Sequence, residues 1–413
     1  MKNRPALVLI HRWCGLVMAG FLLLAGLTGS LLAWYEELDA ATAPELHRVA
    51  LAATPMLDPL VLRERLMAAR PDVIAQASWL HVKPGQSVWF FVEPRPGASE
   101  LANDQIFMNP YTGEVLGARK AGDLSQGMKN LMVFVYRLHY ALALGQAGLV
   151  LMGIVAVTWT VDCFIGAWLT LPMRSPARKP AKAARRTSWW SRWAPAWRVR
   201  WASGGYKLNF DLHRAGGLWL WAALFILAWS SVCFNLPQVY NPVMQALFSH
   251  QPSLKDIPEL PSPRPDPALD FEQAREVGRR LMAAEAARHG FTVLREDWLA
   301  HDPSSGLYQY EVLSSLDLRQ RSGQTKLAFD SNTGAFKALW LPTRAASGDT
   351  IDTWITNLHM ASFGGVPMKL LVCAMGVVVA MLSVTGIVIW VRKRQGRTRV
   401  RLSEPGARPA LHS

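Results

Sequence analysis

The sequence predicts a membrane protein that is mainly α-helical, with four transmembrane helices arranged as a tandem two-span repeat and two small α+β domains between the spans. Composition is the first reason, because 51% of the 413 residues are hydrophobic and 18 are tryptophan, which is too apolar for an ordinary soluble protein. Four long segments almost without charge are the second reason. The third is a short motif, HRWCGLVM from His11 and HRAGGLWL from His213, which opens the first and third segments.

Each apolar segment is long enough to cross about 30 Å of hydrocarbon as a helix that rises about 1.5 Å per residue. Asp162 is the only acid among them. We interpret the first as an uncleaved anchor rather than a signal peptide, because its apolar run is long and no clear cleavage site follows. The predicted spans cover residues 13–34, 146–171, 215–236 and 366–391.

The net charge of +14 is concentrated beside these spans. Residues 172–201 carry nine Lys or Arg and no acid, and residues 392–413 carry seven with Glu404 as the one acid. The positive-inside rule therefore predicts that both termini and the 172–201 segment are cytoplasmic. Membrane lipid is thus a predicted partner and nucleic acid is not, since the charge is explained by membrane topology.

The same rule predicts the order of domains along the chain, with the segments between spans one and two and between spans three and four in the periplasm. Each of these segments begins with a helical pattern and continues with strand-like runs and a Thr-Gly hairpin turn, NPYTGEVLG or DSNTGAFKAL. The predicted parts are helix one at 1–36, outside domain one at 37–135, helix two at 136–172, a basic Trp-rich cytoplasmic loop at 173–210, helix three at 211–237, outside domain two at 238–354, helix four at 355–392 and a basic cytoplasmic tail at 393–413.

The later part of each half repeats without a gap. Ile165-Gly166 follows His139 at the same offsets at which Thr385-Gly386 follows His359. The chain is therefore predicted to be a duplication of span, outside domain and span. Parallel repeats of this kind are usually related by a pseudo-twofold axis along the membrane normal.

The predicted duplication places four histidines at matching positions, two in each half of the chain. His11 and His213 are predicted to begin spans one and three near the cytoplasmic face, and His139 and His359 to begin helices two and four near the periplasmic face. If these helices meet at the axis, two imidazoles face one another at each level, which suits the axial positions of a haem iron. Two b-type haems, bound non-covalently because no C-x-x-C-H motif is present, are the predicted cofactors. The alternative is that these histidines were retained for packing.

Basic residues near the histidines could neutralise haem propionates, although charges at span ends also serve topology and snorkelling. The segment from His139 to Arg174 poses a problem, because as one helix it would measure about 52 Å, more than a bilayer with headgroups. We therefore expect either histidines at the membrane boundary or a bend near Gly145, Gly148 and Pro367. The candidate propionate contacts are Arg12, Arg214, Arg137 and Lys369.

Several stretches together resemble the PepSY-associated transmembrane family over nearly the whole chain. They are HRWCGLVMAGFLLLAGLTGSLLAW, NPYTGEVLG, RLHYAL, DLHRAGGLW and the NLHMASFGG to TGIVIWVRKR ending. The family includes iron-regulated proteins of the bacterial inner membrane and ferric-siderophore reductases, with haem in the membrane and PepSY domains outside. The resemblance implies haem ligation by His11, His139, His213 and His359. This sequence departs from its own repeat in having Ile165 opposite Thr385, and Ser230-Ser231 opposite Thr28-Gly29.

The predicted function is that of an inner-membrane di-haem b-type oxidoreductase, which moves electrons from the cytoplasmic side to the periplasm, reduces a ferric siderophore and releases iron. No catalytic side chain beyond the haem is expected. Because no G-x-G-x-x-G dinucleotide motif is present, a cytoplasmic reductase or membrane quinol must donate the electrons. The alternatives are a non-redox PepSY-type binding or regulatory protein anchored in the membrane, a siderophore or metal transporter, and a haem oxidoreductase with another acceptor.

Overall fold

The computed structural model of the protein describes residues 3–173 and 188–403. The predicted cytoplasmic loop and tail lie partly outside these residues, and Arg174 lies wholly outside them. The chain divides into two compact units. The helical unit comprises Met1–Ser30, His139–Val239 and Leu371–Ser413, and the sheet unit comprises Leu31–Leu138 and Tyr240–Leu370.

Among the described residues, three long apolar helices can cross a membrane, and a bent pair of helices supplies a fourth span if it is counted as one. The three are α1 (Arg4–Leu32), α6 (Gly145–Thr170) and the apolar part of α13 (Gly365–Ser403). Between α6 and the bent pair lie two short helices, α7 (Trp189–Trp193) and η3 (Ala194–Trp197). The protein is therefore a membrane protein with three to four spanning helices.

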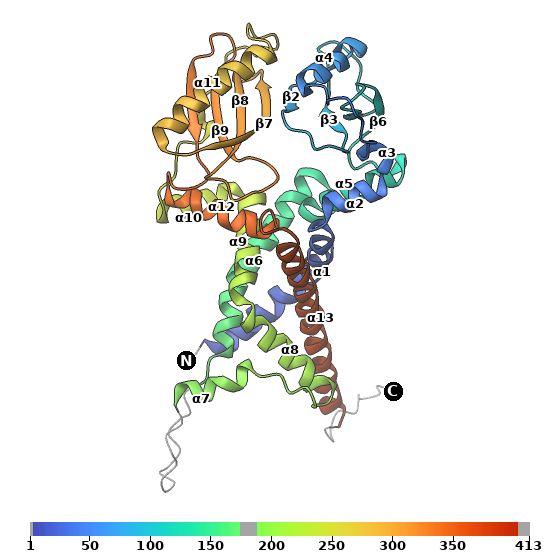
Figure 1. The fold of residues 1–413 in the computed structure, drawn as a ribbon. Coiled ribbons are helices and arrows are strands. Elements are labelled where there is room, and N and C mark those ends of the chain that lie inside the picture. Colours follow the sequence, from blue (N-terminus) through green and yellow to red (C-terminus); the bar gives the residue numbers. More distant parts are fainter. Residues whose placement is uncertain (1–2, 174–187, 404–413) are drawn as a thin grey trace, which may run out of the picture. The chain divides into compact units, whose positions relative to one another are not determined.

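The predicted third helix, 211–237, is not one continuous helix. The structure has two helices there, α8 (Gly205–Trp219) and α9 (Trp221–Asn235), which meet at an angle of 71° (Figure 1). The tryptophans on either side of the break are held by different elements. The Trp219 indole donates to the Trp197 carbonyl and the Trp221 indole to the Cys163 carbonyl on α6, each over 3.0 Å.

The second and fourth predicted helices are each interrupted shortly after their histidine. Helix α5 (Leu131–Ala141) ends before α6, and α12 (Ser347–His359) ends before α13. The connecting residues include left-handed conformations at Leu142 and Ala143 in one break and at Ala361 in the other. The expected bend near Gly145 is thus present. His139 and His359 accordingly lie at the ends of helices that precede the spans, and do not begin the spans themselves.

Small residues bring the helices of the helical unit close together. A Cβ atom on Gly26 of α1 would lie 2.5 Å from the Gly376 carbonyl oxygen of α13, so neither position has room for a side chain. The Ser30 hydroxyl donates to the Cys373 carbonyl beside this crossing, over 2.9 Å. At the break after α5, Asn235 donates to the Tyr140 carbonyl over 2.7 Å. Packing through small residues and polar caps is typical of membrane helices.

The sheet unit contains both segments between the spans. The first contributes α2 (Tyr35–Thr42), α3 (Pro44–His47), α4 (Pro59–Ala69), β1 (Val73–Ile74), β2 (Ala77–Trp79), β3 (Val88–Phe91), β4 (Glu93–Pro94), β5 (Gln105–Met108), β6 (Val115–Arg119), η1 (Leu124–Gln126) and η2 (Met128–Asn130). The second contributes α10 (Pro237–Leu247), η4 (Leu254–Asp256), α11 (Phe271–His289), β7 (Val293–Asp302), β8 (Leu307–Ser314), β9 (Thr325–Asp330), β10 (Phe336–Trp340) and α12.

Both segments have the helix, the antiparallel strands and the hairpin turn that the sequence indicated. Gly113 and Gly334 have positive φ angles of 79° and 70°, and each donates its N–H over 2.8 or 2.9 Å to the residue four positions earlier. Helix α11 packs along the strands of the second segment (Figure 1), with Phe271 and Met282 buried against Tyr308. The Thr-Gly turns therefore join β5 to β6 and β9 to β10.

The two segments also share a sheet, which the sequence did not predict. Strand β2 of the first segment pairs antiparallel with β7 of the second, giving the order β10-β9-β8-β7-β2. Trp79 lies opposite Trp298, with ring centres 4.6 Å apart. The remaining strands of the first segment form separate small sheets, β3-β5-β6 and β1-β4. The two predicted domains are thus joined through a three-residue strand.

Candidate functional site

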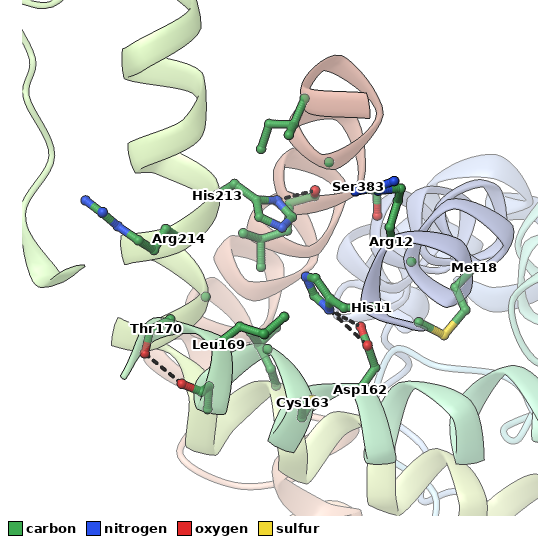
Figure 2. Close-up of a pocket in the computed structure, with 18 of the residues that line it drawn as sticks. His11, Arg12, Met18, Asp162, Cys163, Leu169, Thr170, His213, Arg214 and Ser383 are labelled. Atoms are coloured by element: carbon green, nitrogen blue, oxygen red, sulfur yellow. Dashed lines mark hydrogen bonds and ion pairs between the residues drawn. The ribbon is translucent and has the colours of Figure 1, made fainter. Parts of the chain in front are cut away.

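A cavity of about 430 Å³ lies among α1, α6, α8 and α13, entirely within the helical unit. Its volume is within the usual range for small-molecule and cofactor sites, roughly 300–1,000 Å³. Apolar side chains form most of its wall, and His11 and His213 lie inside it. Figure 2 shows the imidazoles of these two residues, from α1 and α8, directed into the same space.

The His11 ring is fixed by a carboxylate on α6. Its Nδ1 lies 2.9 and 3.0 Å from the two oxygens of Asp162, which is buried (Figure 2). One turn further along α6, Gly166 leaves room for the ring, since a Cβ there would lie 3.4 Å from His11 Cε1. A carboxylate can only accept the bond, so Nδ1 carries the proton. The Nε2 lone pair of neutral His11 is then available to a ligand.

The His213 ring is fixed by the backbone of α13. Its Nδ1 lies 3.0 Å from the Leu382 carbonyl and 3.1 Å from the Thr385 hydroxyl. A Cβ on Gly386 would lie 3.2 Å from His213 Cε1. Because the carbonyl can only accept, Nδ1 of this ring also carries the proton and Nε2 is again left as a lone-pair donor.

The residues that hold the two imidazoles also stand at matching positions in the sequence. Asp162 and Leu382 stand at the same offset from His139 and His359, as do Gly166 and Gly386. From the sequence, the two glycines were identified only as part of the predicted repeat, and Asp162 only as an acid within an apolar segment. Their equal spacing was the signal that could have identified them as the residues that hold the two imidazoles.

The two rings are close enough to share one ligand. Their centres lie 6.2 Å apart and their planes are inclined by 57°. Two neutral imidazoles that each offer the lone pair of Nε2 are a typical donor set for a transition metal. A histidine that binds a metal through one nitrogen almost always donates its other N–H to a carboxylate or a carbonyl, and both rings have this partner.

Basic side chains also line the cavity. Arg12, one of the predicted propionate contacts, is among them, as is Lys393, which sequence reasoning did not single out. Arg214 lines the cavity too, but its side chain extends away from the imidazoles (Figure 2) and donates to Asp211 over 2.9 Å and to the Pro195 carbonyl over 2.8 Å. Within the described residues, its buried Nε has no hydrogen-bond partner.

The remaining predicted site residues lie elsewhere. His139 is in the helical unit, where its Nδ1 lies 2.9 Å from the Thr28 hydroxyl and its ring packs on Gly29, 3.1 Å from a Cβ placed there. His359 is the last residue of α12 and belongs to the sheet unit. The pairing of these two histidines stays a prediction.

Two of the predicted propionate contacts belong to the sheet unit. Arg137 is exposed on α5 and lies beside Gly122, whose Cβ would be 2.8 Å from its Cδ. Lys369 is buried, and its ammonium group is paired with Glu37 and lies 5.0 Å from the centre of the Trp34 ring. The charge of Lys369 is therefore already balanced within the sheet unit.

Comparison with known protein families gives one match over almost the full length. The model of the PepSY-associated TM region matches residues 8–393, which include all four repeat histidines. The comparison with curated proteins gives no match. Since the matched region covers far more than half of the sequence, the chain belongs to the PepSY-associated transmembrane family.

Proposed function

We propose that this protein is a haem-dependent oxidoreductase of the bacterial inner membrane that carries electrons to the periplasm and reduces a ferric siderophore. His11 and His213 would hold one b-type haem, and His139 with His359 a second. The observation that carries the proposal is the pair of imidazoles in the membrane cavity, each with Nδ1 bonded to an acceptor and Nε2 directed inward.

The separation of the two rings supports a shared iron. The ring centres lie 6.2 Å apart, so His11 and His213 could both hold one haem iron, which would supply one-electron transfer. Arg12 and Lys393 at the cavity wall offer cations for carboxylate groups such as propionates. The residues present therefore fit a haem.

Bound haem supplies one-electron transfer, and the chain sets its environment. Asp162 and the Leu382 carbonyl hold the two rings in the ligating tautomer. Side chains of α1, α6 and α13 give the site a mostly apolar wall. Glycines at positions 166 and 386 allow each ring to lie against a helix backbone.

The direction of transfer and the substrate are part of the proposal. The basic segments at 172–201 and 392–413 support cytoplasmic termini and electron entry from a cytoplasmic reductase or from quinol. One electron converts the bound Fe(III) to Fe(II), which binds the hard oxygen donors of siderophores more weakly and is released. The membership in a PepSY-associated family supports this choice through the resemblance described above.

The test is the visible spectrum of the purified protein in detergent, before and after dithionite, with haem quantified as the pyridine haemochrome. We expect about two haems per chain and sharp reduced α bands. His11→Ala and His213→Ala should each remove roughly the same haem, and His139→Ala the other. The exposed His81→Ala is the matched control and should keep both. A colourless protein from haem-replete cells would overturn the proposal and favour a non-redox binding role.

The acceptor is tested separately with the reduced protein and a ferric hydroxamate siderophore as probe. Loss of the reduced α bands together with Fe(II) captured by a chromogenic chelator would support siderophore reduction. Bands that persist in the presence of the siderophore would leave a haem oxidoreductase with a different acceptor.

A further inference from the structure

Three potential metal ligands converge in the sheet unit. His250 lies in the loop after α10, and Asp349 and Asp352 lie in the first two turns of α12. One ligand atom from each residue can be chosen so that all three lie within 4.8 Å of one another. The motif was not apparent in the sequence, because about one hundred residues separate His250 from the two aspartates.

The backbone brings the loop and the helix together. The Gly348 N–H donates to the Ser249 carbonyl over 2.8 Å, and the hydroxyls of Ser249 and Ser347 lie 3.1 Å apart. The His250 ring lies directly on Gly348, where a Cβ would come within 2.1 Å of its Cε1. A glycine at position 348 is therefore required for the ring to occupy this place.

Each of the three side chains is oriented by a partner outside the triad. His250 Nδ1 lies 3.2 Å from the Phe248 carbonyl, which can only accept, so Nε2 is left as the lone-pair donor. The Tyr240 hydroxyl donates to Asp352 Oδ1 over 2.5 Å.

The second aspartate is held in the same way. Gln251 donates its N–H and its side-chain amide to Asp349 Oδ2, over 2.8 and 3.0 Å. One polar atom of each side chain in the triad thus has a hydrogen-bond partner outside the triad. The second polar atom of each, which would bind the metal, is His250 Nε2, Asp352 Oδ2 or Asp349 Oδ1. Metal-binding histidines and carboxylates typically have such outer partners.

The spacing of His250 and Asp352 is that of an ion pair and also fits two ligands of one ion. His250 Nε2 and Asp352 Oδ2 are 3.5 Å apart, whereas a charge-assisted hydrogen bond usually spans about 2.7–2.9 Å. Two ligands about 2.1 Å from a tetrahedral ion are separated by about 3.4 Å. The observed distance is therefore compatible with two ligands of one ion.

We propose that His250, Asp349 and Asp352 bind a divalent first-row transition-metal ion. One imidazole nitrogen and two carboxylate oxygens form a donor set of the kind that Zn²⁺, Mn²⁺ and Fe²⁺ accept. Two carboxylates and a neutral imidazole carry a net charge that a divalent cation neutralises. Three protein ligands leave at least one coordination position for water, so the ion can exchange.

The place of the triad on α12 adds a consequence. Asp352 and His359 are separated by seven residues, which is almost two turns and a rise of about 10 Å, so both lie on one face of the helix. A metal ion in the triad would therefore be held near the predicted ligand of the second haem. A role in receiving Fe²⁺ rests on the proposed function, but metal binding by the triad does not.

The experiment is equilibrium dialysis of the full-length, chelator-treated protein in detergent against micromolar Zn²⁺, followed by elemental analysis. Asp352→Asn and His250→Gln should each bind one zinc fewer than the wild type. Asp266→Asn, an exposed aspartate of the same unit, is the matched control and should bind as the wild type does. Tyr240→Phe keeps all three ligands and should weaken binding by about 10–100-fold.

A second readout is thermal stability, because an ion that binds the folded protein raises its melting temperature. Zn²⁺ should raise the melting temperature of the wild type and leave that of Asp352→Asn unchanged. Equal zinc binding by the wild type and both ligand variants, or no shift in the wild type, would overturn the proposal. Haem content is measured on the same samples, so failure of the triad and failure of the haem proposal are distinguishable.

Discussion

His11 and His213 occupy equivalent places in the two halves of the chain, yet their imidazoles are held by different groups. A side-chain carboxylate at position 162 accepts the N–H of His11, whereas a backbone carbonyl at position 382 accepts that of His213. The halves also differ three residues further on, where Ile165 stands opposite Thr385. The two rings thus have the same hydrogen-bonded nitrogen, but only His11 has a side-chain carboxylate behind it.

If the proposed haem is bound, its two histidine ligands would be electronically distinct. A carboxylate that accepts the N–H of a ligating imidazole makes that imidazole a stronger electron donor. A stronger donor favours the more positively charged oxidation state of the iron and lowers its potential. The comparison predicts that replacing the side chain at position 162 changes haem binding and midpoint potential, and that replacing the side chain at position 382 does not.

The largest effect is expected from Asp162→Leu, which removes the acceptor and leaves the N–H of His11 without a partner. An unsatisfied buried donor costs about 1–3 kcal/mol, so haem should bind roughly 10–100-fold more weakly. Haem retention after dialysis against apomyoglobin measures this loss. The matched control is Leu382→Met, which keeps the backbone carbonyl and a side chain of similar volume in the cavity wall, and should retain haem as the wild type does. Equal losses in the two variants would refute the comparison.

Asp162→Asn should have a smaller effect, because the amide oxygen still accepts the hydrogen bond and only the negative charge is lost. The midpoint potential of one haem should rise by about 60 mV, which is a tenfold change in the equilibrium constant of a one-electron couple. A spectroelectrochemical titration resolves this shift. An unchanged potential would mean that the carboxylate orients His11 without influencing the iron.

The two glycines allow a finer test. A Cβ at position 386 would lie 3.2 Å from its histidine, and one at position 166 would lie 3.4 Å away. Gly386→Ala should therefore displace its ring by a few tenths of an ångström and alter the g values of the oxidised haem, while Gly166→Ala should leave them nearly unchanged. The electron paramagnetic resonance spectra of the two variants provide the measurement. The reverse order would contradict the packing described for these rings.

The smallest effect is expected from Thr385→Val. This change removes one of two acceptors near His213 Nδ1, and the Leu382 carbonyl at 3.0 Å remains. The loss should be below about 1 kcal/mol, so haem content and potential should stay close to those of the wild type. A potential shift as large as that of Asp162→Asn would show that the hydroxyl, and not the carbonyl, is the main partner.

The pairing of His11 with His213 could be predicted from residues that recur at equal spacing in the two halves of the sequence. The equal spacing from His139 and His359 identified the repeat, and the paired His11 and His213 were found in one cavity. The break near Gly145 could also be predicted, because the uninterrupted helix would exceed the bilayer thickness. These inferences rest on periodicity and length, which the sequence carries directly.

Other features depend on contacts between distant residues and could not be predicted. The bend at Leu220 involves no proline, and tryptophan side chains bonded to separate elements hold its two sides. Lys369 looked like a cation at a span end, but its partner Glu37 lies more than three hundred residues earlier. The convergence of His250 with α12 is likewise set by the fold.

Strand β2 has a consequence for how the protein is made. Its partner β7 is synthesised about 220 residues later, which at roughly 5–20 residues per second corresponds to about 10–45 s on the ribosome. During that interval Ala77–Trp79 has no strand to pair with, and two further spans enter the membrane before β7 is complete. The segment between the first and second spans therefore finishes folding only after much of the rest of the chain has been translated, so neither this segment nor the one that contains β7 is expected to mature alone.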